Sequence, residues 1–81
     1  MISEKGKESL LQFGEHLRNL RVSKNLSYRQ MSLLCNVDHA NIRRIEQGKV
    51  NPTLLTIEEL SLGLDVHPSE LLNYKNLEGR P

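Results

Sequence analysis

The feature that most constrains the fold of this chain is the spacing of its apolar residues, which recur at intervals of three and four between widely separated glycines and prolines. In the first such stretch the apolar residues are Leu10, Phe13, Leu17 and Leu20. This spacing places all four on one side of an α-helix, so we expect a helix over residues 7–24 with one buried stripe. The chain shows no alternating pattern typical of a strand, and we therefore expect an all-α fold.

A second helix is predicted over residues 28–35. Ser27, followed three residues later by Gln30, is a capping box that starts it. Asn25 tolerates the left-handed turn that precedes the helix, and Asn36 is suited to end the helix in the same conformation. The residues expected on its inward side are Met31, Leu34 and Cys35.

A third helix is predicted over residues 39–47. Asp38 is suited to cap its first turn, Ile42 and Ile45 form its inward side, and a glycine marks its end. Residues 36–38 separate it from the second helix, and this is the connection length of a helix-turn-helix. The two helices are therefore expected to form one such unit.

The rest of the chain predicts two shorter helices and a single domain. The apolar residues that mark a fourth helix are Leu54, Ile57, Leu60 and Leu64. Pro68 is expected at the first position of a fifth helix that continues through Leu72. With 81 residues, of which 37% are apolar, the chain can build one small core. We expect a helical domain over residues 9–73, an N-terminal extension over residues 1–8 and a polar C-terminal tail over residues 74–81.

The residues that could carry chemistry exclude several classes of protein. A single cysteine, Cys35, rules out an internal disulfide, and His16 and His67 lack the spacing of metal ligands. No serine has a recognisable base and acid, and no glycine-rich phosphate loop is present. No apolar run approaches the length of a membrane span or a secretory signal. We therefore expect a cytoplasmic protein that is not an enzyme and has no metal, cofactor, small-molecule ligand or membrane contact.

The net charge of +1 hides an uneven distribution along the chain. Residues 1–15 carry a net charge of −1 and residues 52–81 carry −3, whereas residues 16–51 hold seven arginines and lysines against two carboxylates, for +5. Such a segment favours one basic face for a polyanion. On charge alone, an ordinary solvated helical surface explains it equally well.

The third predicted helix carries the sharpest functional pattern. With two isoleucines inward, a step of about 100° per residue brings four residues to its outer side and two to its flanks. The outer residues are Ala40, Arg43, Arg44 and Gln47, and the flanking residues are His39 and Asn41. Arginine pairs with guanine, asparagine with adenine, and a small apolar group contacts the thymine methyl. A helix of this kind suits the major groove of DNA.

A set of residues spread along the chain stands at the spacing of a known family: Leu17, Arg21, Leu26, Ser27, Met31, Ser32, Val37, Ile42, Ile45, Glu46, Gly48, Asn51, Pro52, Ile57, Leu60, Leu64 and Val66. On these matches, residues 13–72 resemble the Xre-type, lambda-repressor-like helix-turn-helix domain of bacterial and phage regulators. Asn25, Asn36 and Asp65 stand where the family usually has glycine, and asparagine and aspartate are the other residues best suited to that conformation. Ser32 replaces the usual alanine.

The resemblance implies a five-helix domain whose second helix lies across the DNA backbone and whose third helix reads bases. The residues at base-reading positions are Tyr28, His39, Ala40, Asn41, Arg43 and Arg44. Those at phosphate-contacting positions are Lys24, Ser27, Arg29, Gln47, Lys49 and Thr53. Arg21 and Glu46 match a family ion pair between the first and third helices. The residues expected at a dimer interface around the fifth helix are Leu64, Val66, Leu71, Leu72 and Tyr74.

The function implied is that of a sequence-specific regulator of transcription. We expect a dimeric repressor, similar to stand-alone phage repressors and restriction-modification controller proteins. It would bind double-stranded DNA with its third helix in the major groove of a palindromic operator. A dimer would also support a core this small, which alone rarely supplies more than about 3–5 kcal/mol. The alternative is a protein-interaction module, such as an antitoxin-like partner-binding protein, on the same fold.

Overall fold

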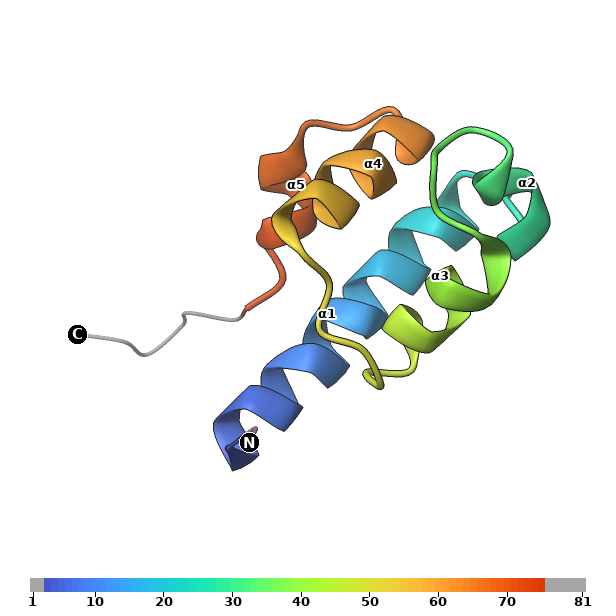
Figure 1. Ribbon diagram of the computed structural model, residues 1–81. Helices are drawn as coiled ribbons and strands as arrows, with labels where there is room; N and C mark the ends of the chain where they lie inside the picture. Colours follow the sequence, from blue (N-terminus) through green and yellow to red (C-terminus); the bar gives the residue numbers. More distant parts are fainter. Residues whose placement is uncertain (1–2, 76–81) are drawn as a thin grey trace.

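The structure, a computed structural model, describes residues 3–75 and contains five α-helices joined by short connections (Figure 1). The helices are α1 (Glu4–Ser23), α2 (Tyr28–Ser32), α3 (His39–Glu46), α4 (Leu54–Leu64) and α5 (Pro68–Leu72). The long helix α1 packs against α3 and α5, while α2 packs against α3 and α4. The described part of the chain contains no strand. The five-helix, all-α architecture expected from the sequence is confirmed.

Each helix begins at a side chain that caps its first turn. The capping residues are Ser3, Ser27, Asp38, Thr53 and His67. In the first four, the side-chain oxygen accepts a hydrogen bond from the backbone amide three residues later, which has no partner inside the helix. At Ser27 the Gln30 side chain also accepts from the Ser27 amide, so the predicted capping box is present.

The cap at Ser3 lengthens α1 beyond the prediction. The Ser3 hydroxyl accepts from the Gly6 amide at 3.1 Å, and the helix begins at Glu4, three residues earlier than expected. Residues 4–8 of the expected N-terminal extension therefore continue α1. Residues 1 and 2 of that expected extension lie outside the described part of the chain.

Left-handed backbone conformations occur where most of the suited residues stand. Asn25 (φ 59°) and Asp65 (φ 56°) adopt this conformation, and Gly48 (φ 73°) follows the end of α3 in the same way. Asn36 does not adopt it, and that prediction is wrong. The physical reason is that α2 ends at Ser32, so Asn36 lies in an irregular turn and not at a helix end.

The early end of α2 also corrects the expected role of Leu34. The side chain was predicted to face inward, but it is 55% exposed. The chain leaves the helix at Leu33, which breaks the helical spacing that would carry Leu34 to the inside. Met31, one turn earlier, is fully buried as expected.

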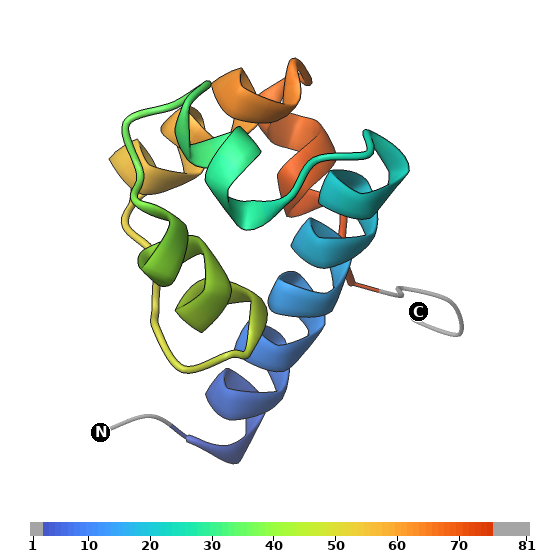
Figure 2. The same ribbon diagram turned by 90° about the vertical axis from the view of Figure 1, so that its right-hand side faces the viewer.

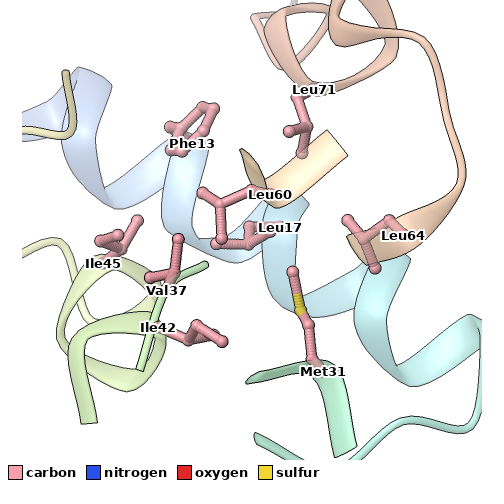
Figure 3. Packing of buried hydrophobic residues seen from close by; sticks show 9 residues of the cluster. All are labelled: Phe13, Leu17, Met31, Val37, Ile42, Ile45, Leu60, Leu64 and Leu71. Atoms are coloured by element: carbon pink, nitrogen blue, oxygen red, sulfur yellow. The ribbon is translucent and has the colours of Figure 1, made fainter. Parts of the chain in front are cut away.

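The core is one cluster to which all five helices contribute (Figure 3). Its buried residues are Phe13, Leu17, Met31, Val37, Ile42, Ile45, Leu60, Leu64 and Leu71. Full burial of a side chain of this size stabilises a fold by about 1.5–3 kcal/mol. Of the predicted inward residues of the first three helices, Phe13, Leu17, Met31, Ile42 and Ile45 are buried in the core, and Leu20 and Cys35 are partly buried against it. Leu10 does not belong to this cluster.

The core takes up two residues that the sequence assigns to a dimer interface. Leu64 is 1% exposed and Leu71 is 0% exposed within a single chain. Their surfaces already pack against other helices, so they cannot meet a second copy, and this part of the prediction is wrong. Leu72 is 49% exposed, and Val66 and Tyr74 are half-buried.

The segment after α5 returns to α1. The Tyr74 ring meets the Phe13 ring edge to face, with centroids 5.3 Å apart. The Tyr74 hydroxyl lies 2.6 Å from the Ser9 hydroxyl, and the two share a hydrogen bond. The polar tail expected over residues 74–81 therefore begins with a packed residue, and residues 76–81 lie outside the described part.

Helices α1 and α3 approach each other most closely at Gly14. A Cβ atom at this position would lie 2.4 Å from the Glu46 carbonyl oxygen and 2.6 Å from that of Ile45. Both atoms belong to the backbone of α3, so they cannot yield unless the whole helix shifts. The observed packing of α1 on α3 therefore requires glycine here.

Replacing Gly14 with alanine is expected to destabilise the protein by about 1–3 kcal/mol, because the added methyl forces α3 away from α1. This loss would appear even though alanine is better than glycine inside a helix by about 1 kcal/mol. Thermal unfolding followed by circular dichroism measures it. Gly63→Ala in α4 is the matched control, since its added Cβ would meet the Cys35 side chain, at 3.1 Å, and no backbone atom among its nearest neighbours. Equal changes in both variants would contradict the close approach at Gly14.

Candidate nucleic-acid interface

Helices α2 and α3 lie next to each other on one face of the molecule, the face turned toward the viewer in Figure 2. Residues 33–38 join them without forming a helix of their own. Ile42 and Ile45 hold the inner side of α3 on the core, so its opposite side faces solvent. The pair is a helix-turn-helix in which α3 is available to a partner.

A shallow hollow of about 380 Å³ lies between the start of α2 and the outer side of α3. Its lining residues are Tyr28, His39, Ala40, Arg43, Arg44, Gln47 and Lys49. All seven belong to the residues predicted to contact DNA, and none is acidic. The fold thus brings together five of the six predicted base-reading residues, although α2 and α3 contribute them separately.

Asn41, the sixth predicted base-reading residue, does not line this hollow. It stands about 140° around α3 from Glu46, whose side chain points toward Tyr28. Its backbone amide donates to the Asp38 carboxylate at 2.8 Å, and the residue is half-buried. Asn41 therefore lies on the flank of α3 opposite to the flank that faces α2.

Of the six residues predicted to contact phosphate, two line the hollow and four do not. Gln47 and Lys49 line it. Lys24, at the end of α1, and Arg29, in α2, are exposed outside it. The remaining two are the helix caps Ser27 and Thr53, whose hydroxyl oxygens accept amide hydrogen bonds from their own helices.

The charges of this face are those of an anion-binding surface. Arg43, Arg44 and Lys49 are exposed, and the first turns of α2 and α3 contain no acidic residue. The carboxylate of Asp38 is close by, but it accepts the amide bond that caps α3. Helix N-termini add a partial positive charge of their own. The combination can bind a polyanion such as a nucleic acid.

Arg21 and Glu46 form a buried ion pair that joins α1 to the end of α3. The Arg21 Nε donates to Glu46 Oε2 at 2.6 Å, and Nη2 donates to Oε1 at 3.1 Å. The two side chains are 9% and 2% exposed. Arg21 Nη1 also donates to the Leu26 carbonyl oxygen at 2.7 Å, just before α2. The ion pair that the resemblance implies is present.

The pair keeps its charges because each partner satisfies the other. The hydrogen bond to Glu46 raises the pKa of Arg21 above its usual value, outweighing the desolvation that lowers it. Within the described residues, no buried side-chain nitrogen or oxygen lacks a hydrogen-bond partner. Removing either side chain of such a buried pair is strongly destabilising, because it leaves the other charge without a partner.

The other candidates for chemistry have structural roles. Burial raises the pKa of the Cys35 thiol, which disfavours the reactive thiolate, and Sγ donates to the Met31 carbonyl oxygen at 3.4 Å. His16 Nε2 lies 2.7 Å from the Glu70 carbonyl oxygen, and His67 caps α5. In the part of the chain that the structure describes, no three metal-ligating side chains gather. No helix in that part is long and apolar enough to span a membrane.

Glu59 takes part in shaping this surface, although the sequence gives no sign of it. Its Oε1 accepts a hydrogen bond from the Asn36 backbone amide at 2.8 Å, so α4 holds the turn between α2 and α3. The two residues are 23 positions apart, and no local spacing connects a carboxylate in one helix with an amide in a distant turn. Only the packing of α4 beside α2 reveals the contact.

Comparison with known protein families identifies the family of this helix-turn-helix domain. The helix-turn-helix family model HTH_3 matches residues 17–71, from within α1 to α5. The chain belongs to this family. It is a family of DNA-binding transcription regulators and not of enzymes. The protein is therefore a helix-turn-helix regulator.

Named relatives show how far the likeness extends. Control protein C.BamHI of Bacillus amyloliquefaciens is 35% identical over 68 residues, which cover 83% of this chain and 84% of C.BamHI. The HTH-type transcriptional repressor RghR of Bacillus subtilis is 42% identical over 64 residues, 78% of this chain and 47% of RghR. The crystal structure of the restriction-modification controller protein C.AhdI from Aeromonas hydrophila superposes with a TM-score of 0.76 at 36% identity, covering 79% of this chain and 97% of C.AhdI. C.AhdI therefore shares the fold described above.

Glu46→Ala is expected to destabilise the protein by about 3–5 kcal/mol, because the buried Arg21 guanidinium loses its partner. Urea unfolding measures the difference. Lys7→Ala is the control, since it breaks the exposed pair of Lys7 and Glu4, whose side chains are 64% and 95% exposed, and such pairs contribute about 0–1 kcal/mol. A loss below about 1 kcal/mol for Glu46→Ala would show that the pair is not a structural link.

Proposed function

We propose that the protein is a dimeric, sequence-specific repressor that inserts α3 into the major groove of a palindromic operator. The observation that carries the proposal is the hollow between α2 and α3, where Arg43, Arg44 and Lys49 meet no acidic side chain. Family membership supports DNA as the polyanion. Operator binding is an event of the cytoplasm, and the free thiol of Cys35 fits that reducing compartment.

Base reading is assigned to the exposed side and flanks of α3. Arg44 is the first candidate for a bidentate contact with guanine, and Arg43 lies beside it. Ala40 suits a thymine methyl, while His39 and Asn41 occupy the flanks. Phosphate contacts, which position the protein without reading sequence, are assigned to Lys24, Ser27, Arg29, Gln47, Lys49 and Thr53.

The proposed dimer uses the exposed surface around α5. Leu72 in α5 is 49% exposed. Val66, before α5, and Tyr74, after it, are partly exposed. A twofold axis near this surface would repeat α3 about 34 Å away, one turn of DNA, which requires an operator with two related half-sites. This interface is smaller than the sequence suggested, because Leu64 and Leu71 are excluded from it.

The names of the relatives support a role in the control of transcription. The likeness covers 84% of C.BamHI and 97% of C.AhdI, which are named as a control protein and a restriction-modification controller. RghR, named as a repressor, shares 42% identity over 64 residues. We therefore propose control of transcription through the concentration of the protein itself or through a partner.

Selection of bound sites from a random duplex library, followed by titration of the best site at two salt concentrations, tests the proposal. A palindromic consensus with half-sites about ten base pairs apart is expected. Affinity should fall by about 10³-fold or more between about 50 and 200 mM salt, because phosphate contacts release counterions. No enrichment from folded protein would favour the alternative, a protein-interaction module on the same fold.

Arg44→Ala and Lys49→Ala are expected to weaken binding in different ways. Loss of Arg44 should remove discrimination at one base pair, worth about 1–3 kcal/mol. Loss of Lys49 should weaken binding to all sequences alike and reduce the salt slope by about one. Titrations against the selected operator and its single-base variants separate the two patterns. The same uniform loss for both variants would contradict base reading by Arg44.

Leu72→Glu is expected to shift the protein from dimer to monomer by placing a charge in the proposed interface. Sedimentation velocity at several protein concentrations measures the shift. Leu33→Glu is the matched control, because Leu33 is 84% exposed at the end of α2 and lies outside that interface. If both variants associate like the wild type, the interface lies elsewhere.

A further inference from the structure

Tyr28 lines the hollow, but its hydroxyl bonds to a buried residue that does not line it. It is the first residue of α2, and its ring is half-buried. The hydroxyl donates to Glu46 Oε1 at 3.1 Å, on the buried carboxylate at the end of α3. The Arg21 guanidinium lies over the ring, with 4.1 Å between Cζ and the ring centroid. The hydroxyl hydrogen and one face of the ring are therefore engaged inside the protein.

The contacts of Glu46 make Tyr28 part of a three-helix junction. Oε2 accepts from Arg21 Nε, and Oε1 accepts from both Arg21 Nη2 and the Tyr28 hydroxyl. Arg21 belongs to α1, Tyr28 to α2 and Glu46 to α3. The one carboxylate thus sets the end of α3 relative to the start of α2, where Tyr28 also lines the hollow.

The engaged hydroxyl hydrogen limits what Tyr28 can donate to a base, although the hydroxyl oxygen can still accept a hydrogen bond. A tyrosine hydroxyl has one hydrogen to donate, and here that hydrogen goes to a carboxylate, which can only accept. Bonds to a charged acceptor are stronger than neutral ones, so a base does not readily take its place. The position of the ring also matters, because α2 has only five residues and depends on contacts with its neighbours to hold its place.

We propose that Tyr28 is a positioning residue for DNA recognition, which locks α3 against the start of α2 through Glu46 and does not read a base itself. This inference rests on the proposed function. It revises the role that the resemblance implies for Tyr28. Discrimination by base contacts depends on placement to within about 0.5 Å. Loss of the Tyr28 hydroxyl therefore affects every base pair that α3 reads.

Tyr28→Phe tests the inference, because it removes the hydroxyl and keeps the ring under Arg21. The probe is the duplex selected from the random library. Binding is expected to weaken about tenfold, on the scale of one hydrogen bond to a charged group. Ser61→Ala is the matched control. It also removes one part-buried hydroxyl that donates a single hydrogen bond, at 2.7 Å to the Glu58 carbonyl oxygen, but in α4 and away from the hollow. Its binding should stay within about twofold of wild type when thermal unfolding shows both variants folded.

Two readouts separate positioning from direct base reading. Against single-base variants of the operator, Tyr28→Phe should reduce discrimination at all base pairs assigned to α3, whereas a lost base contact would affect one base pair. In a double-mutant cycle with Arg44→Ala, the two losses should be less than additive, because both act through the placement of α3. Additive losses confined to one edge base pair, or wild-type binding by Tyr28→Phe, would overturn the inference and leave the proposed function standing. Failure of the wild-type protein to bind any duplex would overturn both.

Discussion

The structure depends on the buried ion pair of Arg21 and Glu46. Nearly all of both side chains is removed from water, and each is tolerated there only because the other is present. The pair carries little stability in itself, since two buried charges lose much of their attraction to desolvation. What it supplies is placement: it links the middle of the fold, α1, to the last residue of the helix that faces solvent. The Leu26 carbonyl and the Tyr28 hydroxyl extend the same network to the start of α2.

The surroundings of the pair explain why the helix-turn-helix is a rigid unit on so small a core. Gly14 allows the backbones of α1 and α3 to meet directly, so the two helices cannot slide without collision. In the turn between α2 and α3, the Asn36 amide donates a hydrogen bond to Glu59 of α4. The ion pair, the close approach at Gly14 and the Glu59 hydrogen bond therefore hold two short helices that have too few hydrogen bonds of their own to be stable alone. Such placement suits the role proposed for the outer side of α3, whose side chains would have to match the spacing of base pairs.

Much of the fold follows from local rules, and the failures have a common cause. Ser27, Asp38 and Thr53 cap their helices because the side-chain oxygen and the free amides lie within one turn of each other. Asn25 and Asp65 take left-handed conformations for reasons internal to each residue. Asn36 has the same intrinsic preference but does not follow it, because α2 ends four residues earlier and a distant carboxylate binds the Asn36 amide. The failures for Leu34, Leu64 and Leu71 are similar, since apolar character predicts that a residue avoids water but not which surface covers it.

The sequence by itself determined the helical class, the caps, most of the core and the cationic outer side of α3, because each depends on residues within a turn or two of one another. The tertiary structure decided where Tyr28 directs its hydroxyl, that Glu59 holds the turn, and that Leu64 and Leu71 belong to the core. These features join residues 18 or more positions apart, or depend on which neighbouring helix covers a side chain in the packed fold. Local spacing carries no information about such contacts, since they exist only once the helices have packed.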